Sequence, residues 1–156
     1  MNTSSKLQRR QFVLVLGAFA AAPLAVARSD GPLVEVWKGP TCGCCKDWIS
    51  HLEANGFRTT VNDSGNADIR RRMGVDLFYG ACHTGLVEGY AIEGHVPARE
   101  IHRLLKERPL SIGLAVPAMP LGSPGMDGPM SGARKQDYDV FLLSKGGSVT
   151  VYQSYR

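Results

Sequence analysis

The chain has 156 residues, 44% of them hydrophobic, and a formal net charge of +4 at pH 7. This length supports one hydrophobic core and excludes two full-sized domains. Three of the cations lie in the first 27 residues, so the remainder is nearly neutral at +1, and no basic face with interleaved aromatic residues follows. The composition therefore argues against nucleic-acid binding.

The N-terminal segment, residues 1–27, is typical of an export signal peptide. The pair Arg9-Arg10 precedes the apolar run 12–22, and residues 25–27 offer small side chains to a signal peptidase. An apolar run of this length is shorter than the about 20 residues that span a bilayer, which favours cleavage over a retained anchor. The arginine pair fits either a twin-arginine signal or the basic flank of a general secretory signal. We therefore expect a periplasmic protein that is not attached to the membrane after signal removal.

The first elements of the mature chain alternate between strands and helices. Residues 33–37 alternate apolar and polar side chains and predict a strand. Residues 42–55 repeat apolar side chains at helical spacing and predict a helix with one buried face. Residues 57–61 predict a second strand, and residues 67–73 predict a short helix that ends at Gly74.

A hairpin and a third helix follow. Residues 84–87 and 90–92 flank a Glu-Gly turn and predict two paired strands. Pro97, at the N1 position, starts a helix whose apolar residues share one face. The order β-α-β-α-β-β-α predicts an α/β domain of the thioredoxin-like kind, which we place at residues 33–156.

Two further segments belong to this domain. Residues 109–132 are rich in proline and glycine without periodicity, so we expect a long loop that acts as a lid or a linker. The thioethers of its Met119, Met126 and Met130 suit Cu(I), or else they attach the loop to the domain by apolar contact. Residues 138–155 alternate around a Lys-Gly-Gly turn and predict a C-terminal β-hairpin that extends the sheet or packs beside it.

All four cysteines are candidate metal ligands. Cys42, Cys44 and Cys45 lie within four residues at the start of the first helix, and Cys82 follows 37 positions later. The unpaired N–H groups and partial positive charge of a helix N-terminus favour thiolate over thiol. Three or four convergent soft donors match Cu(I), with zinc as the less demanding alternative. The pattern therefore predicts a copper site made of cysteine thiolates.

The same cysteines allow two other functions. Cys42 and Cys45 form a CxxC pair where thioredoxin-like enzymes carry theirs, which indicates a periplasmic thiol-disulfide oxidoreductase. Cys44 argues against that reading, because a third thiol within reach would scramble the pairing of a dithiol enzyme. A structural zinc site, or a disulfide-stapled domain that binds a partner, is the third alternative. Whether the protein is an enzyme therefore stays open.

The expected fold also predicts where the histidines lie relative to the cysteines. Residues 79–84 should pass beside the first helix and bring Cys82 to the other cysteines, in place of the cis-proline that usually guards this position. His83 is a fifth candidate ligand, although an extended strand would point it to the opposite face, where it would support the ligands or tune their redox chemistry. His95 either joins the site or caps the helix that follows it. His51 should be solvated on an outward helix face.

The region from Val34 to Tyr152 resembles the CopG-type periplasmic copper-resistance proteins, a thioredoxin-like family long catalogued as a domain of unknown function. The resemblance rests on Thr41-Cys42-Gly43-Cys44-Cys45 with Trp48, on Cys82-His83-Thr84, on Gly89 to Pro97, and on Gly113 to Pro117 with Met119-Pro120 and Gly122 to Met126. One departure is Ala81, where the family pattern has serine. The resemblance implies a thioredoxin-like fold and an association with copper, with the four cysteines at the family's cysteine positions.

Together these features predict an exported protein that holds Cu(I) on cysteine thiolates, contributes to copper resistance or handling, and cycles copper between Cu(I) and Cu(II). The expected partners are copper ions and other periplasmic copper-handling proteins.

Overall fold

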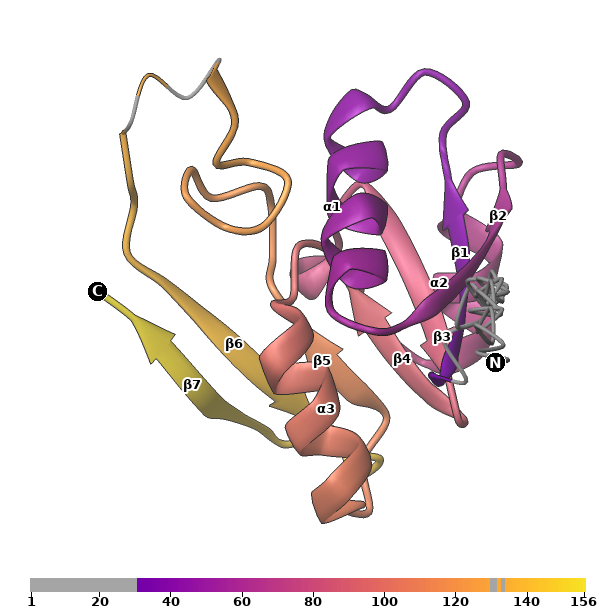
Figure 1. Ribbon diagram of the computed structural model, residues 1–156. Helices are drawn as coiled ribbons and strands as arrows, with labels where there is room; N and C mark the ends of the chain where they lie inside the picture. Colours follow the sequence, from indigo (N-terminus) through magenta and orange to yellow (C-terminus); the bar gives the residue numbers. More distant parts are fainter. Residues whose placement is uncertain (1–30, 130–131, 133) are drawn as a thin grey trace, which may run out of the picture.

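The computed structural model describes residues 31–129, 132 and 134–156 (Figure 1). The expected signal peptide, residues 1–27, lies outside the described residues. In chain order the elements are β1 (Leu33–Lys38), α1 (Gly43–Ala54), β2 (Arg58–Asn62), α2 (Ala67–Met73), the 3-10 segment η1 (Leu77–Tyr79), β3 (His83–Val87), β4 (Tyr90–Glu93), α3 (Ala98–Glu107), β5 (Gly113–Ala115), β6 (Tyr138–Leu143) and β7 (Val149–Tyr155).

All the described strands join one sheet in the order β2-β1-β3-β4-β5-β6-β7. Strand β1 runs parallel to β2 and antiparallel to β3, which in turn pairs antiparallel with β4. Strand β5 pairs parallel to β4 and antiparallel to β6, and β6 and β7 form the last antiparallel pair. The C-terminal hairpin therefore extends the sheet through β5, as Figure 1 shows.

The two faces of the sheet are covered by different helices. The main core packs α1 and α3 against one face, with Trp48, Leu52 and Ile101 fully buried among strand side chains. A smaller cluster on the opposite face joins Val75, which follows α2, to Ala91 and other strand residues. Because neighbouring strand residues point to opposite faces, this sheet is buried on both sides along its centre.

The sequence predicted the order of the strands and α-helices up to α3 correctly, without the 3-10 segment η1, and most bounds agree within one residue. The helix expected at residues 67–73 has those bounds and ends at Gly74, which takes the left-handed conformation with φ 74°. Pro97 is the N-cap of α3 and not its N1 residue. The mixed α/β fold class is confirmed.

The expectation of an unbroken loop at residues 109–132 is wrong in one respect, because strand β5 lies inside it. Three residues are too few to show a periodic pattern, so the sequence carries no strand signal there. Gly113 makes the pairing possible, since a Cβ atom at this position would lie 1.8 Å from the carbonyl oxygen of Ala91 on β4. Later in the segment, Gly125 lies against the backbone of Cys44 and Trp48, and Figure 1 shows the loop after β5 beside α1.

Candidate metal centre

The start of α1 places three cysteines in one turn. Cys42 is the N-cap of the helix, and Cys44 and Cys45 lie in its first turn. The backbone N–H of Cys42 donates to the carbonyl oxygen of Gly39 (3.2 Å), which closes the turn between β1 and α1. No side-chain hydrogen bond caps the helix at Cys42, so the partial positive charge of its first N–H groups lies beside these cysteines.

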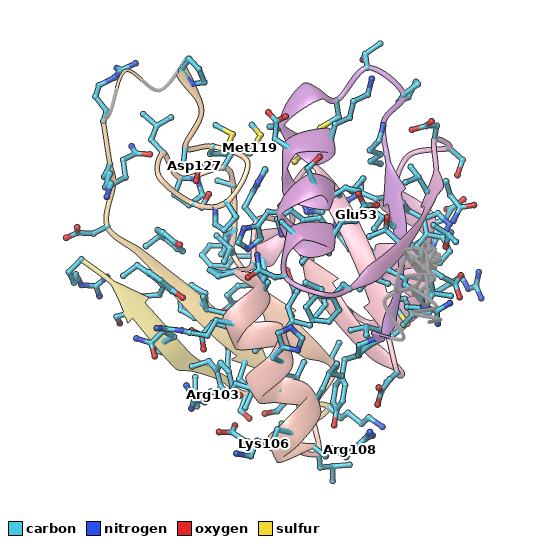
Figure 2. All side chains as sticks on the ribbon, in the orientation of Figure 1. Glu53, Arg103, Lys106, Arg108, Met119 and Asp127 are labelled. Carbon is cyan, nitrogen blue, oxygen red and sulfur yellow. A yellow bond between two sulfur atoms is a disulfide. The ribbon has the colours of Figure 1, made fainter. Side chains whose placement is uncertain are left out.

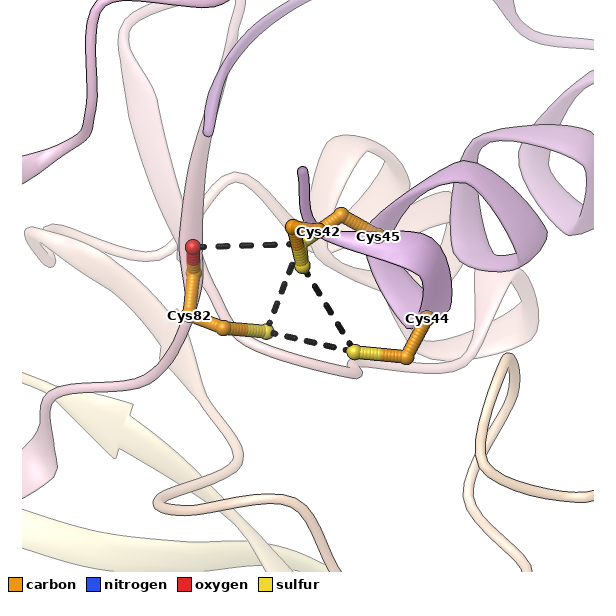
Figure 3. Close-up of side chains that lie close together, drawn as sticks. All are labelled: Cys42, Cys44, Cys45 and Cys82. Atoms are coloured by element: carbon orange, nitrogen blue, oxygen red, sulfur yellow. Dashed lines mark hydrogen bonds between the residues drawn. A yellow bond between two sulfur atoms is a disulfide. The ribbon is translucent and has the colours of Figure 1, made fainter. Parts of the chain in front are cut away.

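The fourth cysteine joins them from the segment before β3 (Figure 3). The Sγ atom of Cys82 lies 3.5 Å from that of Cys45 and 3.9 Å from that of Cys44. The Sγ atoms of Cys42 and Cys44 are 3.6 Å apart. The structure therefore brings together the four cysteines that the sequence singled out, as the expected course of residues 79–84 required.

Two of the four sulfurs are bonded to each other. Cys42 and Cys45 form a disulfide, whereas Cys44 and Cys82 are free thiols. In this oxidised state only two of the four predicted thiolates are available to a metal ion. Reduction of the disulfide by two electrons makes all four available at once.

The Cys82 thiol holds its proton more tightly than a thiol at a helix N-terminus would. Burial, together with the nearby Cys44, raises the pKa of the Cys82 thiol to about 12. Cys82 does not lie on α1, so the partial charge of the helix that stabilises thiolates in the first turn does not dominate here. A metal ion that binds Cys82 must therefore displace its proton.

His83 faces the cysteines, which corrects the expectation that it points to the opposite side. Its Nδ1 atom is 3.3 Å from the Sγ atom of Cys82, and its ring lies 4.2 Å from that of Trp48. Strict alternation applies within a strand, but β3 begins at His83 and Cys82 precedes it. Burial and the neighbouring His95 lower the pKa of His83 to about 3, so its ring is neutral.

His95 also faces Cys82, and it does not cap α3. Its Nδ1–H group donates to the carbonyl oxygen of Pro124 (2.8 Å), and its Nε2 atom lies 3.3 Å from the Sγ atom of Cys82. Burial lowers the pKa of His95. The backbone N–H of Ala98 at the start of α3 donates instead to His51, which is therefore not simply solvated as expected.

The loop after β5 supplies a thioether to the same place. The Sδ atom of Met119 is 3.9 Å from the Sγ atom of Cys44, and Figure 2 shows Met119 beside the N-terminal end of α1. Met119 and Met126 both line a cleft of about 590 Å³ that reaches Cys44. Met130, the third methionine of the prediction, lies outside the described residues.

A tight contact seats this loop on α1. A Cβ atom at Gly125 would lie 2.6 Å from the carbonyl oxygen of Cys44 and 2.7 Å from the backbone nitrogen of Trp48. Gly125 also has a φ of 82°, a conformation that side chains with a Cβ atom rarely adopt. The loop therefore covers the first turn of α1, which favours the lid interpretation over that of a linker.

These features define an α/β protein with a sulfur-rich centre that can hold metal. Two overlapping groups have ligand atoms within 4.8 Å of one another, the four cysteines and the set Cys82, His83 and His95. Among the described residues, no helix is long and apolar enough to cross a membrane.

Comparison with known proteins identifies the family. Two solved structures named "Copper resistance protein copG", Form 2 and Form 1, are each 43% identical to this chain over 81% of its length, with a TM-score of 0.74. The match covers 100% and 98% of those two chains. The chain therefore belongs to the CopG copper-resistance family, as the sequence motifs indicated. A family described as "Protein of unknown function, DUF411" matches residues 79–126, and no curated protein matches. Family and cysteine cluster together support a copper-related function.

Proposed function

We propose that this is an exported, periplasmic copper-binding protein that holds Cu(I) on the thiolates of Cys42, Cys44, Cys45 and Cys82 and contributes to copper resistance. The observation that carries this proposal is the convergence of the four sulfurs within 4.8 Å of one another. Four thiolates this close can bridge more than one Cu(I) ion. The strand order β2-β1-β3-β4 and the helix N-terminus at the site support a thioredoxin-like assignment of this part of the domain.

The donor set favours copper over zinc. Thiolate and thioether sulfur are soft ligands that suit Cu(I), and Met119 adds a thioether 3.9 Å from Cys44. Structural zinc sites use thiolates and imidazoles and are closed by four such ligands. The methionine-lined cleft at Cys44 leaves one side of this centre accessible to solvent, which suits an ion that is taken up and released.

His83 is the fifth ligand in this proposal. Its Nδ1 atom already lies 3.3 Å from the Sγ atom of Cys82, and about 3.5 Å is the separation expected when both atoms bind one ion at 2.0–2.3 Å. His95 either binds the same ion or supports Cys82 through its Nε2 atom. Its hydrogen bond to Pro124 holds the ring in the tautomer whose Nε2 lone pair is free.

The reduced Cys42/Cys45 dithiol provides an electron source for redox activity, and the disulfide is its oxidised form. When the Cys42 and Cys45 thiolates form the disulfide, they release two electrons, and two Cu(II) ions accept them and become two Cu(I) ions. Cys44 and Cys82 stay outside the disulfide, and they hold the product as thiolates once Cu(I) displaces their protons. A dithiol reductant returns the pair to its reduced state and is itself oxidised to a disulfide. Other periplasmic copper-handling proteins are the partners that this cycle implies.

One observation favours a second function, that of a thiol-disulfide oxidoreductase using the Cys42/Cys45 pair. The Sγ atom of Cys82 is 3.5 Å from that of Cys45, so Cys82 can act as a resolving thiol. This function predicts that the metal-free protein reduces insulin and forms a defined mixed disulfide.

The first experiment is an anaerobic Cu(I) competition titration of the reduced chain from Asp30 onward. We expect a dissociation constant below about 1 pM, and we expect Cys82→Ser to bind fewer ions. The matched control is His102→Gln, because His102 is exposed and stacks on Phe57 away from the cysteines. Weak copper binding together with insulin reduction would overturn the copper proposal in favour of disulfide exchange.

A further inference from the structure

Cys82 lies in a segment with no strand hydrogen bonds of its own. It comes between η1 and β3, and no cis peptide bond occurs in the part of the chain that the structure describes. A single residue in such a segment is free to move unless something else holds its backbone. The position of its sulfur, 3.5 Å from Cys45, therefore requires a cause outside the segment.

Side chains from two other elements hold the residue directly before it. The backbone N–H of Ala81 donates to Oε1 of Glu93 on β4 (2.8 Å). The carbonyl oxygen of Ala81 accepts from the guanidinium of Arg70 on α2 and from Nδ2 of Asn66 (3.2 Å). Both polar backbone groups of Ala81 are thus held by side chains.

The holding groups are themselves connected to one another. Nε of Arg70 donates to Oε1 of Glu93 (2.8 Å), and the hydroxyl of Thr84 donates to Oε2 of the same carboxylate (2.5 Å). Asn66 donates to the Thr84 hydroxyl (3.1 Å). Glu93 is fully buried, and a buried carboxylate with these partners has a defined position.

Glycines lie where the groups that hold Ala81 leave no room for a side chain. A Cβ atom at Gly94 would lie 2.6 Å from the Cβ atom of Ala81 and 2.4 Å from the carbonyl oxygen of Val116. A Cβ atom at Gly80 would lie 3.1 Å from the guanidinium of Arg70. Residues without side chains therefore stand where Ala81 and Arg70 approach most closely.

We propose that Glu93 and Arg70 are positioning residues that hold Cys82 against the cysteines of α1. They hold the backbone of Ala81 by hydrogen bonds, whereas the carboxylate of Glu93 reaches the Cys82 thiol only through its charge. In a fold where a cis-proline usually orders this segment, the buried ion pair takes over that task here. The significance of this for copper rests on the proposed function, whereas the positioning of the thiol does not.

Comparison of Cys44 and Cys82 in the same molecule tests this inference. In the oxidised protein these are the two free thiols, so the ratio of their alkylation rates by iodoacetamide, read by peptide mass spectrometry, is internally controlled. We expect Glu93→Gln to raise the Cys82:Cys44 ratio about tenfold, because the loss of a charged hydrogen bond frees the Ala81 backbone. In the reduced protein the same variant should bind fewer Cu(I) ions.

Glu100→Gln is the matched control. Glu100 is also a buried carboxylate, 1% exposed, and it pairs with Arg99 and with the hydroxyl of Tyr155 on the α3 side of the sheet. It should cost comparable stability and leave the alkylation ratio unchanged. An equal rise in this control would overturn the proposal, because general loosening would then explain the effect.

Arg70→Lys keeps the test decisive if Glu93→Gln does not fold. Lysine keeps the positive charge but lacks the planar guanidinium, whose separate N–H groups donate to Glu93 and to the Ala81 carbonyl oxygen at the same time. A smaller rise in the ratio is therefore expected. An unchanged ratio in a folded variant overturns the proposal. A wild-type protein that binds no copper would refute the proposed function and leave this ratio as a valid test of positioning.

Discussion

Gly125→Ala should separate the methionine loop from the cysteine centre. The added Cβ atom would lie 2.6 Å from the carbonyl oxygen of Cys44 and 2.7 Å from the backbone nitrogen of Trp48, whereas ordinary contacts begin near 3.4 Å. The loop must therefore move away from α1 by about 1 Å or α1 must shift, and the φ of 82° adds strain of about 1 kcal/mol. We expect either movement to lengthen the 3.9 Å separation between the Met119 Sδ and Cys44 Sγ atoms.

The assay is Cu(I) affinity of the reduced protein, measured together with the thermal midpoint. We expect the affinity to fall about tenfold, which corresponds to the loss of about 1.4 kcal/mol of binding free energy. Gly128→Ala is the control within the same loop, because a Cβ atom at Gly128 would meet nothing within 4 Å. If Gly125→Ala is folded and binds Cu(I) as tightly as Gly128→Ala, the loop does not contribute to the site and the reasoning fails.

Three further predictions concern stability. The buried rings of His83 and His95 have lowered pKa values, so the unfolded chain binds more protons below pH 6.5. The free energy of unfolding of the metal-free protein should be higher at pH 7 than at pH 5, with a fall of about 2 kcal/mol from His83 alone, and a flat urea-denaturation profile over this range would contradict the argument. Gly113→Ala places a Cβ atom 1.8 Å from a carbonyl oxygen of β4 and should cost more than about 3 kcal/mol or prevent folding, as circular dichroism would show. Tyr155→Phe removes a hydroxyl that donates to the buried Glu100 (2.9 Å) and should cost about 1 kcal/mol in thermal denaturation without a change in copper affinity.

The helices and strands that were predicted correctly are those with a local sequence pattern. The apolar spacing of α1 places Cys45, Trp48, Ile49 and Leu52 on its buried face, as expected. Gly74 ends α2 because a left-handed residue closes a helix. Strand β5 was missed since its pairing with β4 and β6 depends on neighbours far away in the chain.

The histidines show where local reasoning fails. Alternation along an extended strand predicted that His83 would turn away from Cys82, but the strand begins only at His83. For His95 the sequence left two alternatives, joining the site or capping α3, and the contact with Cys82 that decides between them depends on β3 and β4 lying side by side. Glu93 lies within the Gly89–Pro97 motif, but no sequence pattern assigned a role to Glu93 or Arg70, and their roles follow from burial and hydrogen bonds.

By itself the sequence determined the chemistry of the site, because it supplies four cysteine sulfurs and places three of them at the start of a helix. It also determined the order of elements that brings the fourth sulfur near them. These are properties of residue types and of spacing over a few turns, which short-range physics controls. Only the tertiary structure decided which sulfurs are bonded, which imidazoles face them and what holds Cys82 in place. Several of these contacts join residues more than ten positions apart, such as His95 with Cys82 and Glu93 with Ala81, and they depend on the pairing of β3 with β4 and not on local spacing.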